Sequence, residues 1–198
     1  MTELWLVRHG QTDWNLNGIY QGQQDVPLNE TGVAQARTLA EHLRGTPFST
    51  IYSSDLLRAH QTALLLAEVL QVPVRTDPRL REIKQGVWEG KTIDYVRETY
   101  HPDFSPNPKY LTTPRAEGAE SLADVIRRMI DAANEYFARH NGERILLSTH
   151  GLSAAVLYCA AQGIPLVEAG HHIPENARPL IINLKAPMPL PDFLLPNT

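Results

Sequence analysis

The chain has 198 residues, a formal net charge of −4 and one cysteine. This length favours a single globular domain with room for an inserted segment, and the apolar (42%) and charged (20%) fractions argue against disorder. The mild negative charge, without a run of like charges, indicates neither nucleic-acid nor membrane-surface binding. Because the sequence holds no stretch of 18 apolar residues, no membrane span is predicted.

The N-terminus and the cysteine both favour a cytoplasmic protein. The segment Met1–Gly10 has neither a basic region nor a long apolar region, so we predict no signal peptide. Cys159 is the single cysteine and has no partner for a disulfide within the chain. It lies in an apolar stretch, which predicts a buried core thiol in a reducing compartment.

Short apolar runs alternate with segments of helical spacing in the first half of the chain. The runs are too short for helices and predict strands, at residues 4–7 and 51–52 and from residue 72. Apolar residues three and four apart predict helices, at residues 31–43 and 56–70. We expect Ser54 or Asp55 to cap the second of these helices.

Residues 91–119 have a different character. Prolines at positions 102, 106, 108 and 114 break any long helix or strand in this stretch. We interpret it as a small inserted cap of about 91–119 with one short helix near residues 93–100.

The second half of the chain returns to alternating elements. A long helix is predicted over residues 121–140, opened by a capping box of Ser121 and Asp124. A strand at 144–148, a helix from 152, a strand at 180–184 and an extended proline-containing tail on the surface follow. This alternation predicts an α/β fold: a three-layer αβα sandwich with a mainly parallel sheet and a small inserted cap, spanning residues 1–198.

One local pattern occurs twice. Apolar residues 4–7 run into Arg8-His9-Gly10, and apolar residues 145–147 run into Ser148-Thr149-His150-Gly151. Ligands of parallel sheets bind at the carboxyl ends of strands, so we expect His9 and His150 to face one another if their strands are neighbours. The glycines permit a sharp turn and close approach to a ligand, and the helices that follow offer N–H groups suited to phosphate.

Other readings of these histidines have less support. A histidine at a strand end is often structural, but two in matching contexts favour a site. Six histidines could in principle ligate a metal, yet no HxxxH or HExxH spacing occurs, so no metal is predicted. The phosphate loops of nucleotide-binding proteins and the G-x-S-x-G elbow are also absent from the sequence.

Four ordered motifs between residues 6 and 151 carry a family resemblance. They are LVRHGQTDWN at 6–15, SSDLLRAHQTA at 53–63, LREI with GVWEG at 80–90, and THG at 149–151. In this order they resemble the histidine phosphatase superfamily, also called the phosphoglycerate mutase-like family. The resemblance covers about three quarters of the chain and implies a phosphoglycerate mutase-like fold without a cofactor.

The resemblance implies catalytic roles for five residues. His9 would be the nucleophile, attacking phosphorus as a neutral imidazole. Arg8, Arg58 and His150 would surround the phosphoryl oxygens, where fixed cations stabilise transition-state charge without a metal. Glu82 would protonate the leaving alcohol and then accept a proton from water.

Further residues are expected to bind the substrate. Asn15, Gln21, Gly22 and Gly151 would complete the phosphate pocket. Lys84 and Gln85 depart from the residues that many relatives carry, and Lys84 either contacts an anionic part of the substrate or points to solvent. Lys109 and Arg115 of the cap are weaker candidates, because the cap is where substrate choice is expected.

These features favour a metal-independent phosphatase that hydrolyses small phosphate monoesters through a phosphohistidine. The GVWEG segment resembles the phosphatase branch, whereas the mutase branch carries a YGxLxGxNK-like stretch. Phosphoglycerate mutase is therefore the alternative, and a non-catalytic phospholigand-binding module is a second one. The candidate substrates are phosphoserine, sugar phosphates, phosphoglycerates and α-ribazole phosphate. The expected partner is a small phosphorylated metabolite, without nucleic acid or membrane, and a homodimer is possible at the level of the family.

Overall fold

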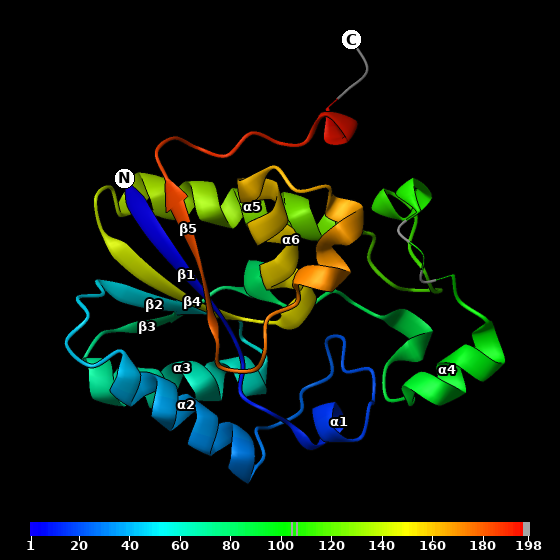
Figure 1. Cartoon of the computed structure of the whole chain (residues 1–198), viewed down its shortest axis with the longest axis horizontal. Coiled ribbons are helices and arrows are strands. Elements are labelled where there is room, and N and C mark those ends of the chain that lie inside the picture. The colour runs from blue at the N-terminus through cyan, green and yellow to red at the C-terminus, as the bar shows by residue number, and fades with distance from the viewer. Residues whose placement is uncertain (104, 106, 196–198) are drawn as a thin grey trace.

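The computed structural model describes residues 1–103, 105 and 107–195. Within these residues five strands form one sheet in the order β3-β2-β4-β1-β5 (Figure 1). The pairs β1–β4, β2–β4 and β2–β3 are parallel, and β5 pairs antiparallel with β1. The strands are β1 (Thr2–Arg8), β2 (Thr50–Ser53), β3 (Val74–Thr76), β4 (Arg144–Thr149) and β5 (Pro179–Leu184).

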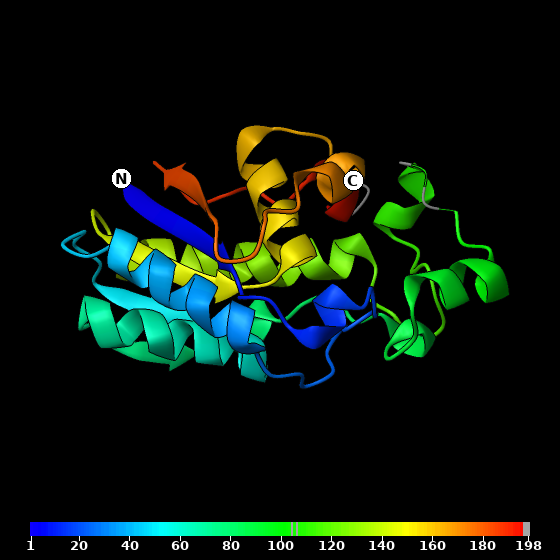
Figure 2. The same ribbon diagram turned by 60° about the horizontal axis from the view of Figure 1, so that its bottom comes forward.

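Helices cover both faces of the sheet (Figures 1 and 2). Successive residues of a strand point to opposite faces, and the core follows this rule. Val7 and Leu146 belong to the core under α2 and α3, whereas Leu6 and Leu147 belong to the core under α5 and α6. The predicted three-layer α/β fold is therefore confirmed. These helices are α2 (Glu30–His42), α3 (Leu57–Leu70), α5 (Leu122–Arg139) and α6 (Gly151–Gln162).

The N-terminal cap of α5 agrees with the prediction from the sequence, whereas that of α3 differs from it. Ser121 and Asp124 form the predicted capping box of α5. For α3 the N-cap is Leu56, which makes no side-chain cap bond, so the expected capping by Ser54 or Asp55 is wrong. Asp55 is held instead in an ion pair with Arg81 at 2.5 Å.

The described residues between 91 and 119 project beside the carboxyl end of the sheet, at the right of Figure 1. They contain α4 (Ile93–Tyr100) and a 3-10 helix at Pro108–Leu111. The short helix near residues 93–100 is therefore confirmed, whereas the division of the chain into a domain with a cap stays a prediction. A four-residue helix, α1 (Asp13–Leu16), was not predicted.

The C-terminal tail passes over α5 (Figure 1) and is fixed there. Met188 is buried, and its N–H and carbonyl both bond to the side chain of Asn134, at 2.6 and 2.9 Å. A 3-10 helix at Asp192–Leu194 interrupts the expected extended path. Cys159 is buried and free, as predicted. No helix in the described part of the chain has the length and apolar character to cross a bilayer.

Two glycines allow the backbone of α2 to pack closely against the loop that carries His9. A Cβ on Gly10 would lie 2.4 Å from the Gly32 carbonyl oxygen, and a Cβ on Gly32 would lie 2.1 Å from the Gln11 carbonyl oxygen. The expectation that Gly10 makes room for a ligand is therefore corrected, because the group it admits is a turn of α2.

We expect Gly32→Ala to lower the free energy of unfolding by about 3 kcal/mol, because backbone atoms must separate to admit the methyl group. Activity should fall with it, since the displaced loop holds His9. Urea unfolding measures the first effect and a phosphatase assay the second. Gly170→Ala is the control, because nothing lies within 4 Å of its added Cβ. Equal stability of the two variants would contradict this account.

Candidate active site

The two His-Gly sequences lie side by side at the carboxyl end of the sheet. Arg8 of β1 lies opposite Thr149 of β4, and His9 N–H donates to the Thr149 carbonyl at 3.0 Å. The His9 and His150 ring centroids are 5.2 Å apart. The expectation that these strands are neighbours and bring both histidines together is confirmed.

The hydrogen bonds of His9 define which ring nitrogen carries the proton. Nδ1 lies 2.7 Å from the Gly10 carbonyl oxygen, which can only accept, so Nδ1 carries the proton and donates it. Nε2 lies 3.2 Å from Nε of Arg58, which can only donate. Nε2 therefore carries no proton, and its lone pair, which accepts from Arg58 in the absence of a ligand, is the one that a nucleophilic imidazole needs.

Burial keeps both histidines neutral. Removal from water lowers the pKa of His9 well below its ordinary value, and the charges of Arg58 and Arg8 add to this, while the bond to Gly10 opposes it. The pKa of His150 is also lowered well below its ordinary value, first by burial and then by the charge of Arg58. Both rings thus stay uncharged in the range where free histidine takes up a proton.

Polar atoms beside the histidines lack partners among the described residues. Arg8 Nε and His150 Nδ1 are buried without a hydrogen bond. Arg58 is 1% exposed, and burial lowers the pKa of its guanidinium to about 10, although the charge of Glu82 opposes this. Buried polar atoms and cations are costly unless an acceptor satisfies them. An oxyanion with several acceptor oxygens has the matching chemistry.

Arg58 and His150 are themselves fixed by neighbours. Arg58 Nη1 and Nη2 donate to the carbonyls of Gln24 and Gly22, each at 2.8 Å. His150 Nε2 lies 2.9 Å from the Ser54 hydroxyl, and Arg8 Nη1 donates to the Pro174 carbonyl at 2.9 Å. The cations and the second histidine therefore stand in place before any ligand arrives, as preorganised stabilisation requires.

Glu82 lies at the N-terminus of α6. Its Oε1 accepts from Ile83 N–H at 3.0 Å and from the N–H and hydroxyl of Ser153, both at 3.1 Å. Its Oε2 accepts from Leu152 N–H at 3.2 Å and keeps a second lone pair. The expectation that this helix start offers its N–H groups to phosphate is wrong for Leu152 and Ser153, because Glu82 occupies them.

The four residues expected to complete the phosphate pocket differ in what their polar groups contact. Asn15 uses its Oδ1 to cap α1, accepting from Thr12 N–H at 3.1 Å. Gln21 is buried, and its Oε1 has no partner among the described residues. Gly22 offers its carbonyl to Arg58, and Gly151 lies where an added Cβ would be 3.5 Å from Arg8 Nε. Gly22 and Gly151 thus lie next to the arginines, and Gln21 is buried just before Gly22 in the chain. The amide oxygen of Asn15 is used in a helix cap.

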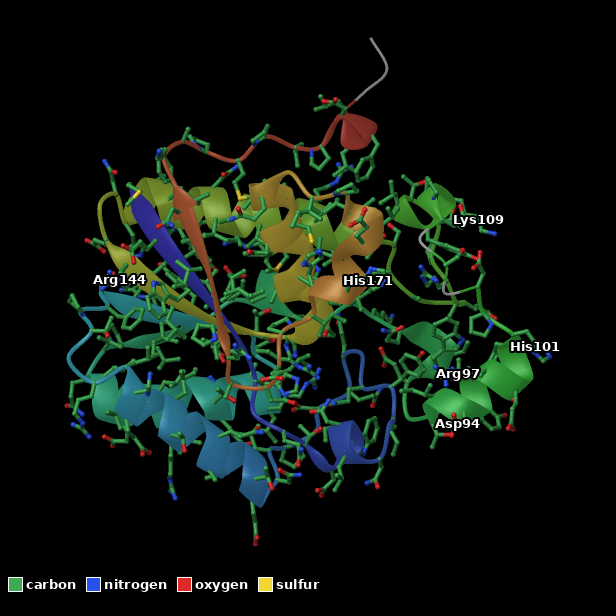
Figure 3. All side chains as sticks on the ribbon, in the orientation of Figure 1. Asp94, Arg97, His101, Lys109, Arg144 and His171 are labelled. Carbon is green, nitrogen blue, oxygen red and sulfur yellow. The ribbon has the colours of Figure 1, made fainter. Side chains whose placement is uncertain are left out.

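Of the two alternatives given for Lys84, a contact with an anionic part of the substrate and a side chain in solvent, the structure favours the second. Its side chain is exposed and is not among the residues that line the neighbouring cavity, whereas Gln85 and Arg115 are. The backbone N–H of Lys84 donates to the carboxyl group of Glu120 at 2.8 Å. Lys109 lies at the outer edge of its segment (Figure 3) and rests on the Tyr110 ring, 4.7 Å from the centroid.

Several residues around the site were not identified from the sequence. Ser54 and Ser153 orient His150 and Glu82. Thr62 accepts from Gly10 N–H at 3.1 Å, and Asn176 donates to the His9 carbonyl at 2.7 Å. Ser54 and Thr62 lie within the SSDLLRAHQTA motif, which is a signal that could have found them. Asn176 is distant in sequence and carries no such signal.

Arg128 of α5 binds the loop that carries Glu82. Its Nη1 donates to the carbonyls of Arg79 and Arg81 at 2.7 and 2.6 Å, and its Nη2 donates to the Glu82 carbonyl at 3.2 Å. Its Nε also donates to Glu120 Oε1 at 3.1 Å. Arg128 is therefore a positioning residue that fixes the loop on both sides of Glu82.

We expect Arg128→Met to lower the free energy of unfolding by about 3 kcal/mol, the lower end for breaking a buried ion pair, since the side chain is 16% exposed. Turnover of alkyl phosphates should fall more than that of p-nitrophenyl phosphate, because displaced Glu82 protonates poor leaving groups badly. Unfolding curves and paired assays measure both effects. Exposed Arg127→Met on the same helix is the control. Equal losses with both esters would reduce Arg128 to a structural role.

Stability should fall in mild acid because of the two neutral histidines. Their pKa values are lowered in the folded state, so the unfolded chain binds protons first as pH falls below about 6.5. Each contributes up to about 1.4 kcal/mol per pH unit until the folded-state pKa is reached. Urea unfolding between pH 7.5 and 5 should show this slope, reduced in His9→Gln and unchanged in exposed His42→Gln. An unchanged slope in His9→Gln would contradict a neutral buried His9.

The arrangement defines a phosphoryl-transfer site. A neutral imidazole with an unprotonated Nε2, a buried and a partly buried arginine, and a carboxyl group lie at one end of the sheet. Among the described residues, no three His, Cys, Asp or Glu side chains gather as a metal-binding group would. Fold and site together are those of an enzyme that acts on phosphate esters.

The chain belongs to the histidine phosphatase superfamily, because the model of its branch 1 matches residues 4–187. It is 34% identical to phosphoserine phosphatase 1 of Hydrogenobacter thermophilus over 188 residues, covering 93% of this chain and 88% of the relative. It is 36% identical to a probable phosphoglycerate mutase, GpmB, of Proteus mirabilis over 168 residues, covering 83% and 77%.

The solved structures agree with this assignment. Bacillus stearothermophilus YhfR superimposes with a TM-score of 0.84 at 34% identity, covering 95% of this chain and 94% of that chain. Family and fold thus establish a histidine-phosphatase-type hydrolase, and the family also contains proteins named as mutases.

Proposed function

We propose that this enzyme hydrolyses small phosphate monoesters, without a metal ion, through a phosphohistidine on Nε2 of His9. The state of His9 carries the proposal: its Nδ1 proton is bound by the Gly10 carbonyl, which leaves the Nε2 lone pair facing Arg58. Arg8, Arg58 and His150 are assigned to the phosphoryl oxygens, and Glu82 to proton transfer. Gln21, Gly22 and Gly151 remain assigned to the same pocket.

In the first step the Nε2 lone pair attacks phosphorus. The N–P bond forms while the P–O bond to the alcohol breaks, and protonated Glu82 gives its proton to the leaving oxygen. Oε2 is the atom assigned to this transfer, because Oε1 already accepts three hydrogen bonds. The guanidinium groups stabilise the charge spread over the phosphoryl oxygens.

In the second step water attacks the phosphohistidine. Its oxygen bonds to phosphorus, its proton passes to Glu82, and the N–P electron pair returns to Nε2. Inorganic phosphate leaves, and both residues regain their starting states. No metal enters either step, because fixed cations and a proton donor supply the stabilisation that a metal would give.

Rapid-quench labelling with a ³²P-phosphate ester in the presence of EDTA tests the mechanism. We expect a protein-bound label that is stable in base and labile in acid, as a phosphoramidate is, with turnover unaffected by EDTA. An acid-stable label, or turnover that EDTA abolishes, would overturn the proposal.

Mutase activity is the second candidate, since a relative is named a probable phosphoglycerate mutase. Incubation with 3-phosphoglycerate, followed by ³¹P NMR, distinguishes the two activities: a mutase yields the 2-phospho isomer and a phosphatase yields inorganic phosphate. Phosphoserine has the support of the relative named phosphoserine phosphatase 1. A cytoplasmic location and a homodimer stay predictions from the sequence.

A further inference from the structure

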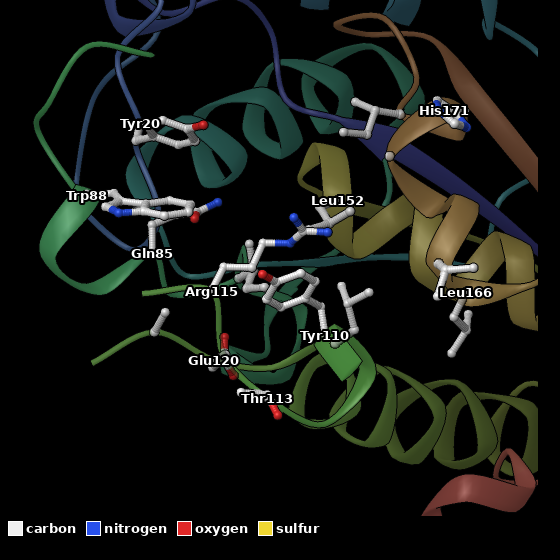
Figure 4. A pocket seen from close by; sticks show the side chains of 16 residues that line it. Tyr20, Gln85, Trp88, Tyr110, Thr113, Arg115, Glu120, Leu152, Leu166 and His171 are labelled. Atoms are coloured by element: carbon white, nitrogen blue, oxygen red, sulfur yellow. The ribbon is translucent and has the colours of Figure 1, made fainter. Parts of the chain in front are cut away.

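A cavity of about 280 Å³ is lined by residues that include Ile83, which follows Glu82 in the chain, and Leu152 of α6; Figure 4 shows it from close by. Two residues that line it, Ile83 and Leu152, are the ones whose N–H groups bind the two oxygens of the Glu82 carboxyl group. The cavity therefore lies next to residues that hold the Glu82 carboxyl group, although Glu82 itself is not among its lining residues. Resting on the proposed function, this places the leaving group of the substrate in the cavity.

The walls of the cavity are largely aromatic and aliphatic. The Tyr20 and Trp88 rings lie on one side, tilted by 44° with 5.4 Å between their centroids, and the Arg115 guanidinium lies 4.2 Å from the Tyr110 ring centroid on the other. Leu152 lies near this second pair (Figure 4). Flat groups of this kind pack against a planar ring and bury its apolar surface.

The polar side chains of the cavity do not favour a second anionic group. Glu120 lines the cavity with its carboxyl group paired to Arg128, and it offers no hydrogen-bond donor to an anion. Arg115 donates to the carbonyls of Asp103 and Ser105 and packs on Tyr110, so its guanidinium is already committed. The exposed Lys84 and Lys109 do not line the cavity.

We propose that the preferred substrates are phosphate monoesters of an alcohol that carries a planar aromatic ring, which binds in this cavity. Small anionic esters such as phosphoserine would be turned over less efficiently. Burial of one ring in such a cavity corresponds to about a 30-fold gain in kcat/KM over an ester without it.

The test compares 2-phenylethyl phosphate with ethyl phosphate, whose leaving alcohols have similar acidity, so that the difference reports binding of the ring. We expect kcat/KM to be about 30-fold higher for the phenylethyl ester. Tyr110→Ala should reduce this ratio about tenfold, and Val167→Thr on another wall should reduce it less, with ethyl phosphate unaffected. Tyr100→Ala, an exposed residue of α4, is the control and should keep the full ratio.

A ratio near one in the wild type would overturn the proposal while leaving the phosphatase mechanism intact. So would faster turnover of phosphoserine that is lost selectively in Arg115→Gln, because this would assign the cavity to a second anion. Binding separates the cavity from catalysis: in His9→Ala, calorimetry should show 2-phenylethylphosphonate binding about 30-fold more tightly than ethylphosphonate. That result would support the cavity even if no ester were hydrolysed, and equal affinities would contradict it.

Discussion

Replacing His9 with alanine is expected to lower kcat by about 10⁴–10⁶-fold, the range seen when an enzyme loses its nucleophile. His9 is the group assigned to the N–P bond, and alanine offers no atom to take its place. Binding of phosphate should persist, because Arg8, Arg58 and His150 keep their own fixing contacts to Pro174, Gly22, Gln24 and Ser54. Steady-state kinetics and calorimetry with inorganic phosphate measure the two quantities.

His42→Ala is the matched control, because His42 is exposed at the end of α2. It should retain wild-type rates. A His9→Ala enzyme that still turns over p-nitrophenyl phosphate at more than a hundredth of the wild-type rate would overturn the assignment of the nucleophile. Loss of phosphate binding together with activity would instead mean that His9 is needed to hold the site together.

Replacing Glu82 with glutamine is expected to slow alkyl phosphate hydrolysis by about 10²–10⁴-fold, the usual contribution of a general acid or base. Glutamine keeps an acceptor oxygen for the donors at Ile83 and Ser153 but has no proton of the required acidity. Release of p-nitrophenol needs no such proton, because p-nitrophenolate is a stable leaving group. The first step should therefore be nearly normal with p-nitrophenyl phosphate.

The second step still needs Glu82 as a base, which gives a sharp kinetic signature. With p-nitrophenyl phosphate the Glu82→Gln variant should release a burst of about one p-nitrophenol per site and then turn over slowly. Stopped-flow absorbance measures the burst, and exposed Glu98→Gln on α4 is the control. Equal slowing with both esters and no burst would show that the substitution disturbs the structure of the site instead of proton transfer.

The two roles of Glu82 depend on a carboxyl group that the protein holds firmly. Donors from Ile83 and Ser153 occupy Oε1, and Arg128 fixes the backbone on both sides of Glu82. Arg128 also binds Glu120, which lines the cavity proposed for the leaving group. Arg128 thus links the loop of the proton donor to one residue of the cavity wall.

Much of the fold could be predicted from local patterns. The alternation of apolar runs with helical spacing reflects forces that act within a few residues, and the Ser121–Asp124 capping box of α5 is of this kind. The start of α3 shows the limit of such patterns. Ser54 and Asp55 are good caps by residue type, but Ser54 bonds to His150 and to the N–H of Leu56, the residue before α3, and Asp55 bonds to Arg81. Tertiary partners outcompeted the local preference.

Some residues of the candidate site could likewise be predicted from sequence motifs, and others could not. Motifs at residues 6–15, 53–63, 80–90 and 149–151 indicated the residues that the structure brings together at one end of the sheet. Lys84 was indicated only by its departure from relatives, and its side chain is exposed. Arg128 was not found at all, because an arginine at helical spacing on α5 looks like any solvated charge until its backbone partners are known.

Sequence alone was enough to predict the α/β class and the order of most elements, because both depend on periodicity. It also indicated His9, Arg8, Arg58, Glu82 and His150 as candidate site residues, because ordered motifs that resemble the family contain them. The tertiary structure alone decided which groups contact which. It placed Glu82, not phosphate, on the first N–H groups of α6, set a turn of α2 against Gly10, and gathered Tyr20, Trp88, Tyr110 and Arg115 around one cavity. The reason is physical: these contacts join residues tens of positions apart, and their geometry is fixed only when the layers pack.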